Sequence, residues 1–193
     1  MFNSISEEIS LRLVTDRLIP IDKMKYYTYG IELVLNNLLI FLSIAVISIL
    51  TDNIRISFAY ILTYCPIRNY VGGYHCKTYT KCYFTTLILY ILMLIFDTYL
   101  FDNRLIVSCI LLVITIPMIL ILTPVDFGYG PISDNDRKKY RKRSTVLIAL
   151  ALLSFIFSIV THQPNVAFAI SWGMFVVFLL MMRSLFEKLS KVR

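Results

Sequence analysis

Long apolar runs separated by short charged segments make up most of the chain. Residues 28–50 contain one charged side chain and residues 105–123 contain none. A helix needs about 20 apolar residues to cross the hydrocarbon core of a bilayer, and both runs reach that length. No residue from Ser144 to Met182 is charged, and the turn-forming sequence THQPN divides this run in two. The pattern predicts membrane-spanning helices at residues 28–50, 54–72, 83–101, 105–123, 144–160 and 166–184.

The span predicted at residues 54–72 has a short uncharged part. Residues 56–67 would rise only about 18 Å as a helix, whereas the hydrocarbon core is about 30 Å thick. The helix can therefore cross only by continuing into the next segment, RNYVGGYHCKTYTKCYF at residues 68–84. We expect it to end inside that segment.

The first 27 residues are polar but carry an apolar stripe. Phe2, Ile5, Ile9 and Leu13 recur at helical spacing among acidic and basic side chains. A helix with one apolar stripe and a charged remainder is typical of the membrane interface. We therefore expect an amphipathic interfacial helix within residues 1–27.

Composition supports the same fold class. Hydrophobic residues make up 58% of the 193 positions, and the mean hydropathy is +0.74. A soluble domain of this length could not bury so much apolar surface. We expect an all-α polytopic membrane protein with about six transmembrane helices. A single domain would cover residues 1–193, with the helical bundle at 28–186, a reactive segment at 66–82 and a basic loop at 124–143.

The basic residues are distributed unevenly between the predicted loops. If six spans alternate in direction, seventeen of the nineteen Lys and Arg residues fall on the side that holds both termini. Only Arg55 and Arg104 fall on the opposite side. Because basic residues concentrate in cytoplasmic loops, the termini and the segment at 66–82 are predicted to be cytoplasmic. This bias explains the net charge of +7 without nucleic acid as a partner.

The segment at 66–82 gathers groups suited to nucleophilic catalysis. It contains His75, Cys76 and Cys82, which are one of the two histidines and two of the four cysteines in the chain. A thiolate is a strong nucleophile, and an imidazole nearby can take the thiol proton and later return it to a leaving amine. Lysine side chains in the segment would favour the anionic sulfur.

Spacing leaves the choice of cysteine open. Cys76 is adjacent to His75, and neighbouring side chains point away from each other in helices and strands. Cys82 would share a helical face with His75, but about 10 Å away along a straight helix. The segment must therefore bend to bring Cys82 to the histidine. His75, Cys76 and Cys82 could instead provide three zinc ligands, although no fourth ligand is nearby in the sequence.

Two charged residues and two glycines are candidates for supporting roles. Glu32 is the only charge in its span and could orient His75 or bind substrate, but it could also be an interfacial carboxylate. Arg68 could pair with Glu32, stabilise an oxyanion or only anchor the topology. Gly72 and Gly73 permit a turn, or a close approach of substrate to the backbone, before the histidine.

One segment resembles the accessory gene regulator B family: it reads RNYVGGYH, followed by six further residues and then Cys82. A second similar stretch is TPVDFGYGPISDNDRKKYRKRS at residues 123–144, where the family often has a Pro-Val-Asp sequence followed by a charged segment. The likeness covers most of the chain, although Cys76 stands where the family commonly has a small residue. Members are bacterial membrane cysteine endopeptidases that process the propeptide of a quorum-sensing signal.

The resemblance implies roles for individual residues. His75 and Cys82 would be the catalytic pair, and Cys76 would have no role. Cleavage through an acyl-enzyme thioester, followed by cyclisation to a thiolactone or lactone, would need no cofactor and no metal. The partners would be the cognate propeptide and the lipid bilayer of the cell membrane, and a homodimer is compatible with six-span units. The basic run would bind an acidic propeptide tail, although topology anchoring explains the same residues, among them Lys138, Lys139 and Lys142.

A different class of function would use the same helices. A small membrane transporter or peptide exporter would treat the segment at 66–82 as a gate and would perform no covalent chemistry. Such a protein would need polar residues facing a central path in several spans, and spans three to six contain few.

For the peptidase hypothesis, the sequence specifies neither the propeptide nor its cleavage site.

Overall fold

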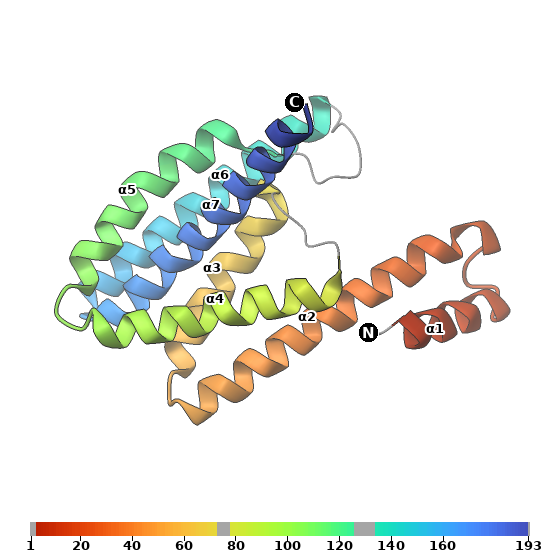
Figure 1. Cartoon of the computed structure of the whole chain (residues 1–193), viewed down its shortest axis with the longest axis horizontal. Coiled ribbons are helices and arrows are strands. Elements are labelled where there is room, and N and C mark those ends of the chain that lie inside the picture. Colours follow the sequence, from red (N-terminus) through yellow and green to blue (C-terminus); the bar gives the residue numbers. More distant parts are fainter. Residues whose placement is uncertain (1–2, 73–77, 126–133, 193) are drawn as a thin grey trace. The chain divides into compact units, whose positions relative to one another are not determined.

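The computed structural model describes residues 3–72, 78–125 and 134–192, and these residues form helices and turns without a strand (Figure 1). The predicted all-α fold class is therefore confirmed. Two compact units are present, a first unit made of Met1–Leu50 with Cys76–Tyr90 and a second made of Thr51–His75 with Ile91–Arg193. The helices are α1 (Asn3–Thr15), the 3-10 helix η1 (Ile21–Lys23), α2 (Met24–Leu50), α3 (Ile54–Val71), α4 (Tyr79–Tyr99), α5 (Arg104–Leu122), α6 (Asp134–Val160) and α7 (Pro164–Val192).

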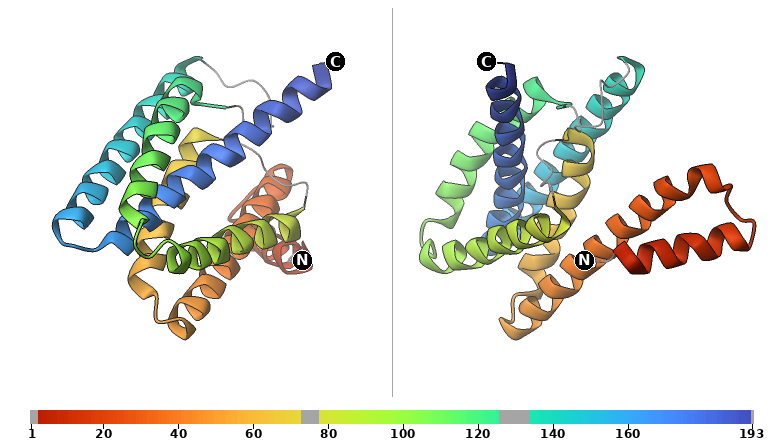
Figure 2. Two further views of the ribbon diagram at one scale, coloured as in Figure 1. Left: turned by 60° about the vertical axis from the view of Figure 1, so that its left-hand side comes forward. Right: turned by 45° about the vertical axis from the view of Figure 1, so that its right-hand side comes forward.

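The second unit is built around α7, which contacts α3, α5 and α6 (Figure 2). This helix is deeply covered, with Phe168, Met174 and Val176 all at 0% exposure. Pro164 occupies its first position, where the missing amide hydrogen of proline removes no helical hydrogen bond. The break predicted from THQPN is thus confirmed, and the last predicted span is the central helix of this unit.

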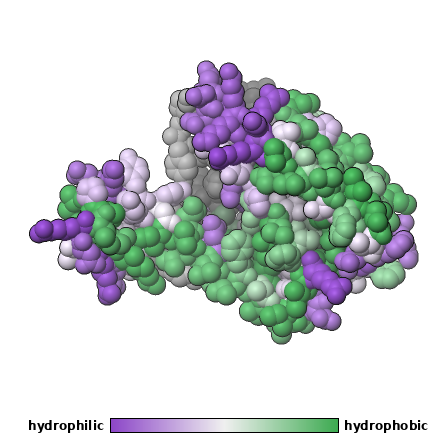
Figure 3. All heavy atoms as spheres, turned by 180° about the vertical axis from the view of Figure 1, so that it is seen from behind, coloured by the Kyte–Doolittle hydropathy of each residue, from purple (hydrophilic) through white to green (hydrophobic). Residues whose placement is uncertain are grey.

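Within the described residues, five helical segments are long and apolar enough to cross a membrane. Their large apolar side chains are widely exposed, as in Val113 (73%) and Phe157 (68%). Figure 3 shows apolar surface over the helices of the second unit, with hydrophilic side chains gathered at the end where α6 begins. The chain is therefore a polytopic membrane protein. The five segments are Ile21–Leu50, Thr80–Tyr99, Arg104–Leu122, Asp134–Val160 and Pro164–Glu187.

The remaining predicted span corresponds to α3, which has 18 residues and ends at Val71. The helix therefore continues into the segment at 68–84, as predicted. It is not among the five apolar segments because it carries Arg55 and Arg68 as well as several polar side chains. Packing against α6 and α7 accounts for its place in the bundle instead. Its buried large side chains include Tyr60, Tyr64 and Ile67.

In the first unit, α1 packs along α2 through a face of small residues. Ser6 and Ser10 have no exposed surface, whereas Ile5 and Ile9 are 51% and 38% exposed. The apolar stripe of α1 is thus available to lipid, and the interfacial position of this helix stays a prediction. The first span is longer than expected, because α2 already begins at Met24.

The two ends of the second unit differ in charge. Arg55 and Arg104 lie in the first turns of α3 and α5, whose other ends meet at the opposite side of the unit. Arg104 donates a hydrogen bond of 2.9 Å to Asp97, and the two side chains are only 12% and 9% exposed. The opposite end holds the start of α6 with the basic run at 137–143. The basic residues of this unit are therefore separated as the predicted alternation requires.

Thiol labelling of intact cells tests the predicted orientation. With the native cysteines replaced by alanine, the Asp102→Cys variant should react with a membrane-impermeant maleimide from outside, because this exposed residue lies in the turn between α4 and α5. The Lys138→Cys variant, exposed on α6, should react only after the cells are permeabilised. The reverse pattern would show that the basic end faces outward.

Candidate active site

The reactive segment begins in the last turns of α3 and continues beyond the end of this helix. Gly72 follows Val71 with φ 78°, in the left-handed region that glycine adopts without the strain a side chain would cause. Its amide donates a hydrogen bond of 3.2 Å to the carbonyl of Arg68 and closes the helix. Gly72 therefore ends the helix in a conformation that suits a turn, and a role of the two glycines in substrate binding stays a prediction. Within this segment, the residues that lie outside the described part of the chain are Gly73, Tyr74, His75, Cys76 and Lys77.

Cys82 lies in the first turn of α4, and its side chain is half-buried. Thr78 caps this helix: its hydroxyl accepts a hydrogen bond of 3.4 Å from the Lys81 amide, and its carbonyl accepts one of 3.2 Å from the Cys82 amide. Such an N-cap fixes the backbone of the first helical turn. The candidate nucleophile is therefore held at the start of a helix and not on a loop.

His75 and Cys82 would share a helical face only if one helix contained both residues, since seven residues span nearly two helical turns. Thr78 lies between them and is not helical, since α4 begins at Tyr79. Helical periodicity therefore cannot relate the two side chains. A bend between them, which the sequence required, agrees with the non-helical backbone at Thr78.

A polar contact joins the N-terminal part of α4 to α2. The hydroxyls of Tyr83 and Ser43 share a hydrogen bond of 2.8 Å. Glu32 also belongs to α2, where it is half-buried and lies one turn before Asn36, the first residue of the buried stripe of this helix. Glu32 is thus part of the first unit, whereas Arg68 belongs to the second. A pairing of these two charges stays a prediction.

Arg68 lies in the last turn of α3 and interacts with its own helix. Its Nη1 donates a hydrogen bond to the Tyr64 hydroxyl, and its guanidinium carbon lies 5.4 Å from the centre of the Tyr64 ring. Tyr64 in turn stacks on Tyr60, with ring centres 5.4 Å apart. These contacts hold the guanidinium close to the end of α3, one turn before the glycines.

Two sequence stretches that are far apart in the chain meet beside the reactive segment. The Val125 amide donates a hydrogen bond of 3.0 Å to the Val71 carbonyl. Val125 belongs to the TPVD sequence that follows α5, and Val71 is the last residue of α3. Thr123, Pro124 and Val125 are all buried. The Pro-Val sequence therefore supports the backbone from which the reactive segment starts.

The basic run at 137–143 is helical, so the predicted loop at 124–143 is wrong for its second half. α6 begins at Asp134, and Asp134 and Asp136 lie in its first turn, where acidic side chains complement the helix dipole. Lysine and arginine are good helix formers, so the run continues without a break into the apolar span. The exposed side chains of the run include Lys138, Lys139 and Lys142.

The basic helix is attached to the end of α3. The guanidinium carbon of Arg143 lies 5.5 Å from the ring centre of Tyr70, and the rings of Tyr70 and Tyr140 are 6.1 Å apart. Sequence reasoning missed both tyrosines. The sequence offered one indication of them. Each of the two stretches that carry the family resemblance contains an aromatic residue with basic residues nearby, which can form a cation–π contact. The exposed basic side chains are thereby placed near the start of the reactive segment.

Comparison with known families shows what kind of protein this arrangement belongs to. The family model described as accessory gene regulator B matches residues 3–183. The chain belongs to the accessory gene regulator B family. The match includes the reactive segment, the Pro-Val-Asp sequence and the basic helix, and it makes the chain a membrane protein of accessory gene regulation in quorum sensing. No curated protein and no solved structure matches the chain significantly.

A metal-bound version of the site would need residues from the reactive segment. Within the described residues, no group of three His, Cys, Asp or Glu side chains is placed to hold a metal ion. The zinc alternative depends on His75 and Cys76, which lie outside those residues. Chelation and metal content therefore provide its test.

Proposed function

We propose that the protein is a membrane-embedded cysteine endopeptidase that processes the propeptide of a quorum-sensing signal. Family membership supports the substrate class, because accessory gene regulator B proteins are associated with peptide processing. The observation that carries the catalytic proposal is the position of Cys82. Its thiol belongs to a capped first helical turn, seven residues after His75 in the sequence.

Cleavage divides into two proton-coupled steps. The His75 imidazole takes the proton of the Cys82 thiol as the sulfur attacks a backbone carbonyl near the C-terminal side of the propeptide. The C–N bond of the tetrahedral intermediate then breaks, and the imidazolium returns the proton to the departing amine. The N-terminal fragment stays on Cys82 as a thioester.

Release proceeds by cyclisation. A cysteine or serine side chain upstream in the bound fragment attacks the thioester carbonyl and regenerates the Cys82 thiol. The product is a thiolactone or a lactone macrocycle. Exchange of one thioester for another is nearly isoenergetic, so forming a thiolactone needs no nucleotide. The sequence accordingly contains no phosphate-binding P-loop motif.

The proposed setting is the cytoplasmic face of the bacterial cell membrane, in line with the distribution of basic residues. Arg68, held at the end of α3, is the candidate for stabilising the oxyanion. Glu32 is the candidate for orienting His75. A homodimer is a separate prediction, because every group in the proposed chemistry comes from one chain.

Trapping with hydroxylamine tests the proposal. The reconstituted protein should convert its cognate propeptide into a cleaved, cyclic product. Neutral hydroxylamine in the same reaction should divert the N-terminal fragment to a hydroxamate of defined mass, because hydroxylamine attacks thioesters but not peptide bonds. An unchanged product distribution at high hydroxylamine concentration would contradict a thioester intermediate.

The basic helix should bind the substrate in addition to setting topology. A combined Lys138→Gln, Lys139→Gln and Lys142→Gln variant should raise KM about tenfold with little change in kcat, because each exposed charge pair contributes about 1 kcal/mol or less. The three side chains are exposed on the helix attached to α3, and the propeptide is expected to end in an acidic tail. Cleavage kinetics at low and high salt measure the effect, which salt should weaken.

The triple variant keeps the arginines of the run, so its positive charge still favours the cytoplasmic side. Keeping Arg143 also preserves the contact with Tyr70. Lys23→Gln with Lys25→Gln provides a matched control, since both lysines are exposed in the first unit. This control should leave KM unchanged. If the triple variant also has an unchanged KM at low salt, the lysines serve only as anchors.

A further inference from the structure

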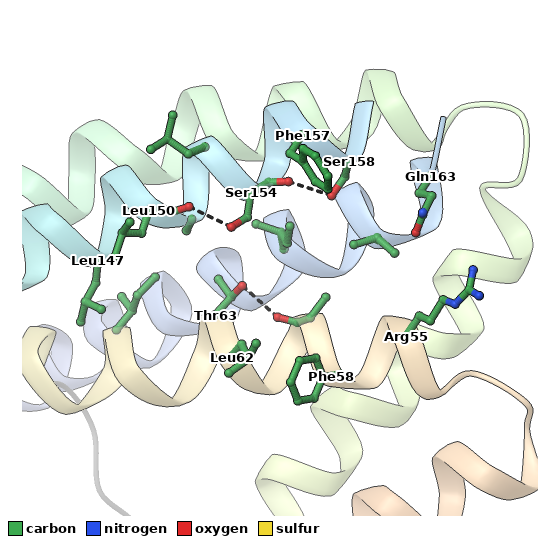
Figure 4. Close-up of a pocket in the computed structure, with 16 residues that line it drawn as sticks. Arg55, Phe58, Leu62, Thr63, Leu147, Leu150, Ser154, Phe157, Ser158 and Gln163 are labelled. Atoms are coloured by element: carbon green, nitrogen blue, oxygen red, sulfur yellow. Dashed lines mark hydrogen bonds between the residues drawn. The ribbon is translucent and has the colours of Figure 1, made fainter. Parts of the chain in front are cut away.

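A groove lies on the second unit between α3, α6 and the start of α7 (Figure 4). Its volume is about 880 Å³, within the range of about 300–1,000 Å³ that is usual for ligand sites. Among the described residues, those given a catalytic or supporting role above are not part of its lining.

The lining of the groove is mainly aliphatic and aromatic. Phe58 and Leu62 of α3 and Leu150 and Phe157 of α6 line it, and these side chains are between 53% and 68% exposed. α6 is one of the helices apolar enough to cross a membrane, and α3 packs against it. Exposed apolar side chains on a membrane-spanning helix face the acyl chains of the bilayer and not water. The groove is therefore open to lipid.

The length of the groove corresponds to one leaflet. Along α3 its lining runs from Arg55 to Ile67. This distance is about 18 Å along a helix, and half of a hydrocarbon core is about 15 Å thick. An acyl chain of one leaflet can therefore follow the groove over its whole length.

Charge is confined to one end of the groove. Arg55 is the charged side chain among the described residues that line it, and no carboxylate accompanies it there. Figure 4 shows Arg55 and Gln163 at the same end, with Leu62 and Leu147 farther along. α3 begins next to Arg55, and Asn53 makes no side-chain capping hydrogen bond to it, so the dipole of this helix adds to the positive potential.

We propose that this groove binds an anionic phospholipid, with the phosphate at Arg55 and one acyl chain between α3 and α6. The ligand must combine an anionic head with an apolar tail about one leaflet long, and a phospholipid has both. A net anionic headgroup is favoured over a zwitterionic one, because the cation of a zwitterionic head opposes the charge of Arg55. The proposal does not depend on the catalytic function.

Native mass spectrometry of the detergent-purified protein tests the site. Titration with phosphatidylglycerol and with phosphatidylcholine of the same acyl chains should show about fivefold tighter binding of phosphatidylglycerol. Arg55→Gln should remove this preference, and Arg55→Lys should keep most of it because the charge is retained. Equal affinity for the two lipids in the wild-type protein would overturn the proposal, as would an unchanged preference in Arg55→Gln.

A second pair of variants tests the groove itself. Leu62→Trp fills the apolar part and should weaken the binding of both lipids. Val113→Trp is the matched control, because Val113 is 73% exposed on α5 and does not line the groove. It should bind lipid as the wild type does. If Leu62→Trp alters the oligomeric state and leaves lipid binding unchanged, the occupant is a second copy of the chain and the proposal fails.

Discussion

Cys82→Ala should abolish cleavage of the cognate propeptide, whereas Cys76→Ala should retain activity within about twofold. Loss of a catalytic nucleophile lowers kcat by several orders of magnitude, and we expect a loss of more than about 1,000-fold here. Without the Cys82 sulfur no thioester can form, so the hydroxamate product should disappear together with the cleaved product. Cys76 is adjacent to the proposed base, and the family pattern leaves it without a role. Rates of cleavage by the reconstituted variants measure the difference.

Two further variants make the assignment of Cys82 specific. Cys109→Ala removes an exposed thiol from α5, which is not part of the reactive segment in the sequence, and should behave as the wild type does. Cys82→Ser preserves the shape of the side chain but is a far weaker nucleophile at neutral pH, so it should also be inactive. Abolished cleavage in Cys76→Ala together with retained cleavage in Cys82→Ala would assign the nucleophile to Cys76 instead.

The fold was predictable where hydropathy alone decides it. Five of the expected spans coincide with helices that are apolar enough to cross a membrane. α3 shows the limit of this reasoning, because Arg55 and Arg68 lower its hydropathy and its packing against α6 and α7 compensates. The uncharged part of α3 is too short to cross the membrane, so the helix had to continue into the reactive segment. This requirement alone predicted that it ends near Val71.

Charge runs were harder to interpret than apolar runs. Residues 134–143 were expected in a loop because they interrupt the apolar pattern, yet they form the first turns of α6. Lysine and arginine have good helix propensity, and Asp134 and Asp136 begin the helix with favourable charges. A hydropathy pattern marks where a helix leaves the membrane, but it does not mark where the helix begins.

The candidate site depends on contacts between segments that no local pattern reports. The hydrogen bond from Val125 to Val71 and the packing of Tyr70 against Arg143 join stretches more than fifty residues apart in the sequence. The resemblance had marked both stretches, but it did not place them together. The spacing between His75 and Cys82 left the choice of cysteine open, and it cannot decide that choice now, because a helical period holds only within one continuous helix and α4 begins at Tyr79.

His75→Ala should lower kcat by about 100-fold to 10,000-fold, the usual contribution of a positioned general base. The alanine leaves Cys82 in place but removes the group that takes its proton and returns it to the leaving amine. Added imidazole should therefore restore part of the cleavage activity in His75→Ala, since a free base can enter the vacated space. The same imidazole should have no effect on Cys82→Ala, which lacks the nucleophile. Cleavage rates against imidazole concentration measure this rescue.

The metal content of the protein separates proton transfer from zinc binding. If His75 acts as a base, EDTA and phenanthroline should leave wild-type cleavage unchanged. Imidazole rescue of His75→Ala should then also persist in the presence of either chelator. If His75, Cys76 and Cys82 hold zinc, the purified protein should contain one zinc ion per chain, and Cys76→Ala should lose it along with activity. Cleavage that stops on chelation and returns with zinc would therefore replace the acid–base mechanism with a metal-dependent one, since a thiol–imidazole pair needs no ion to transfer its proton.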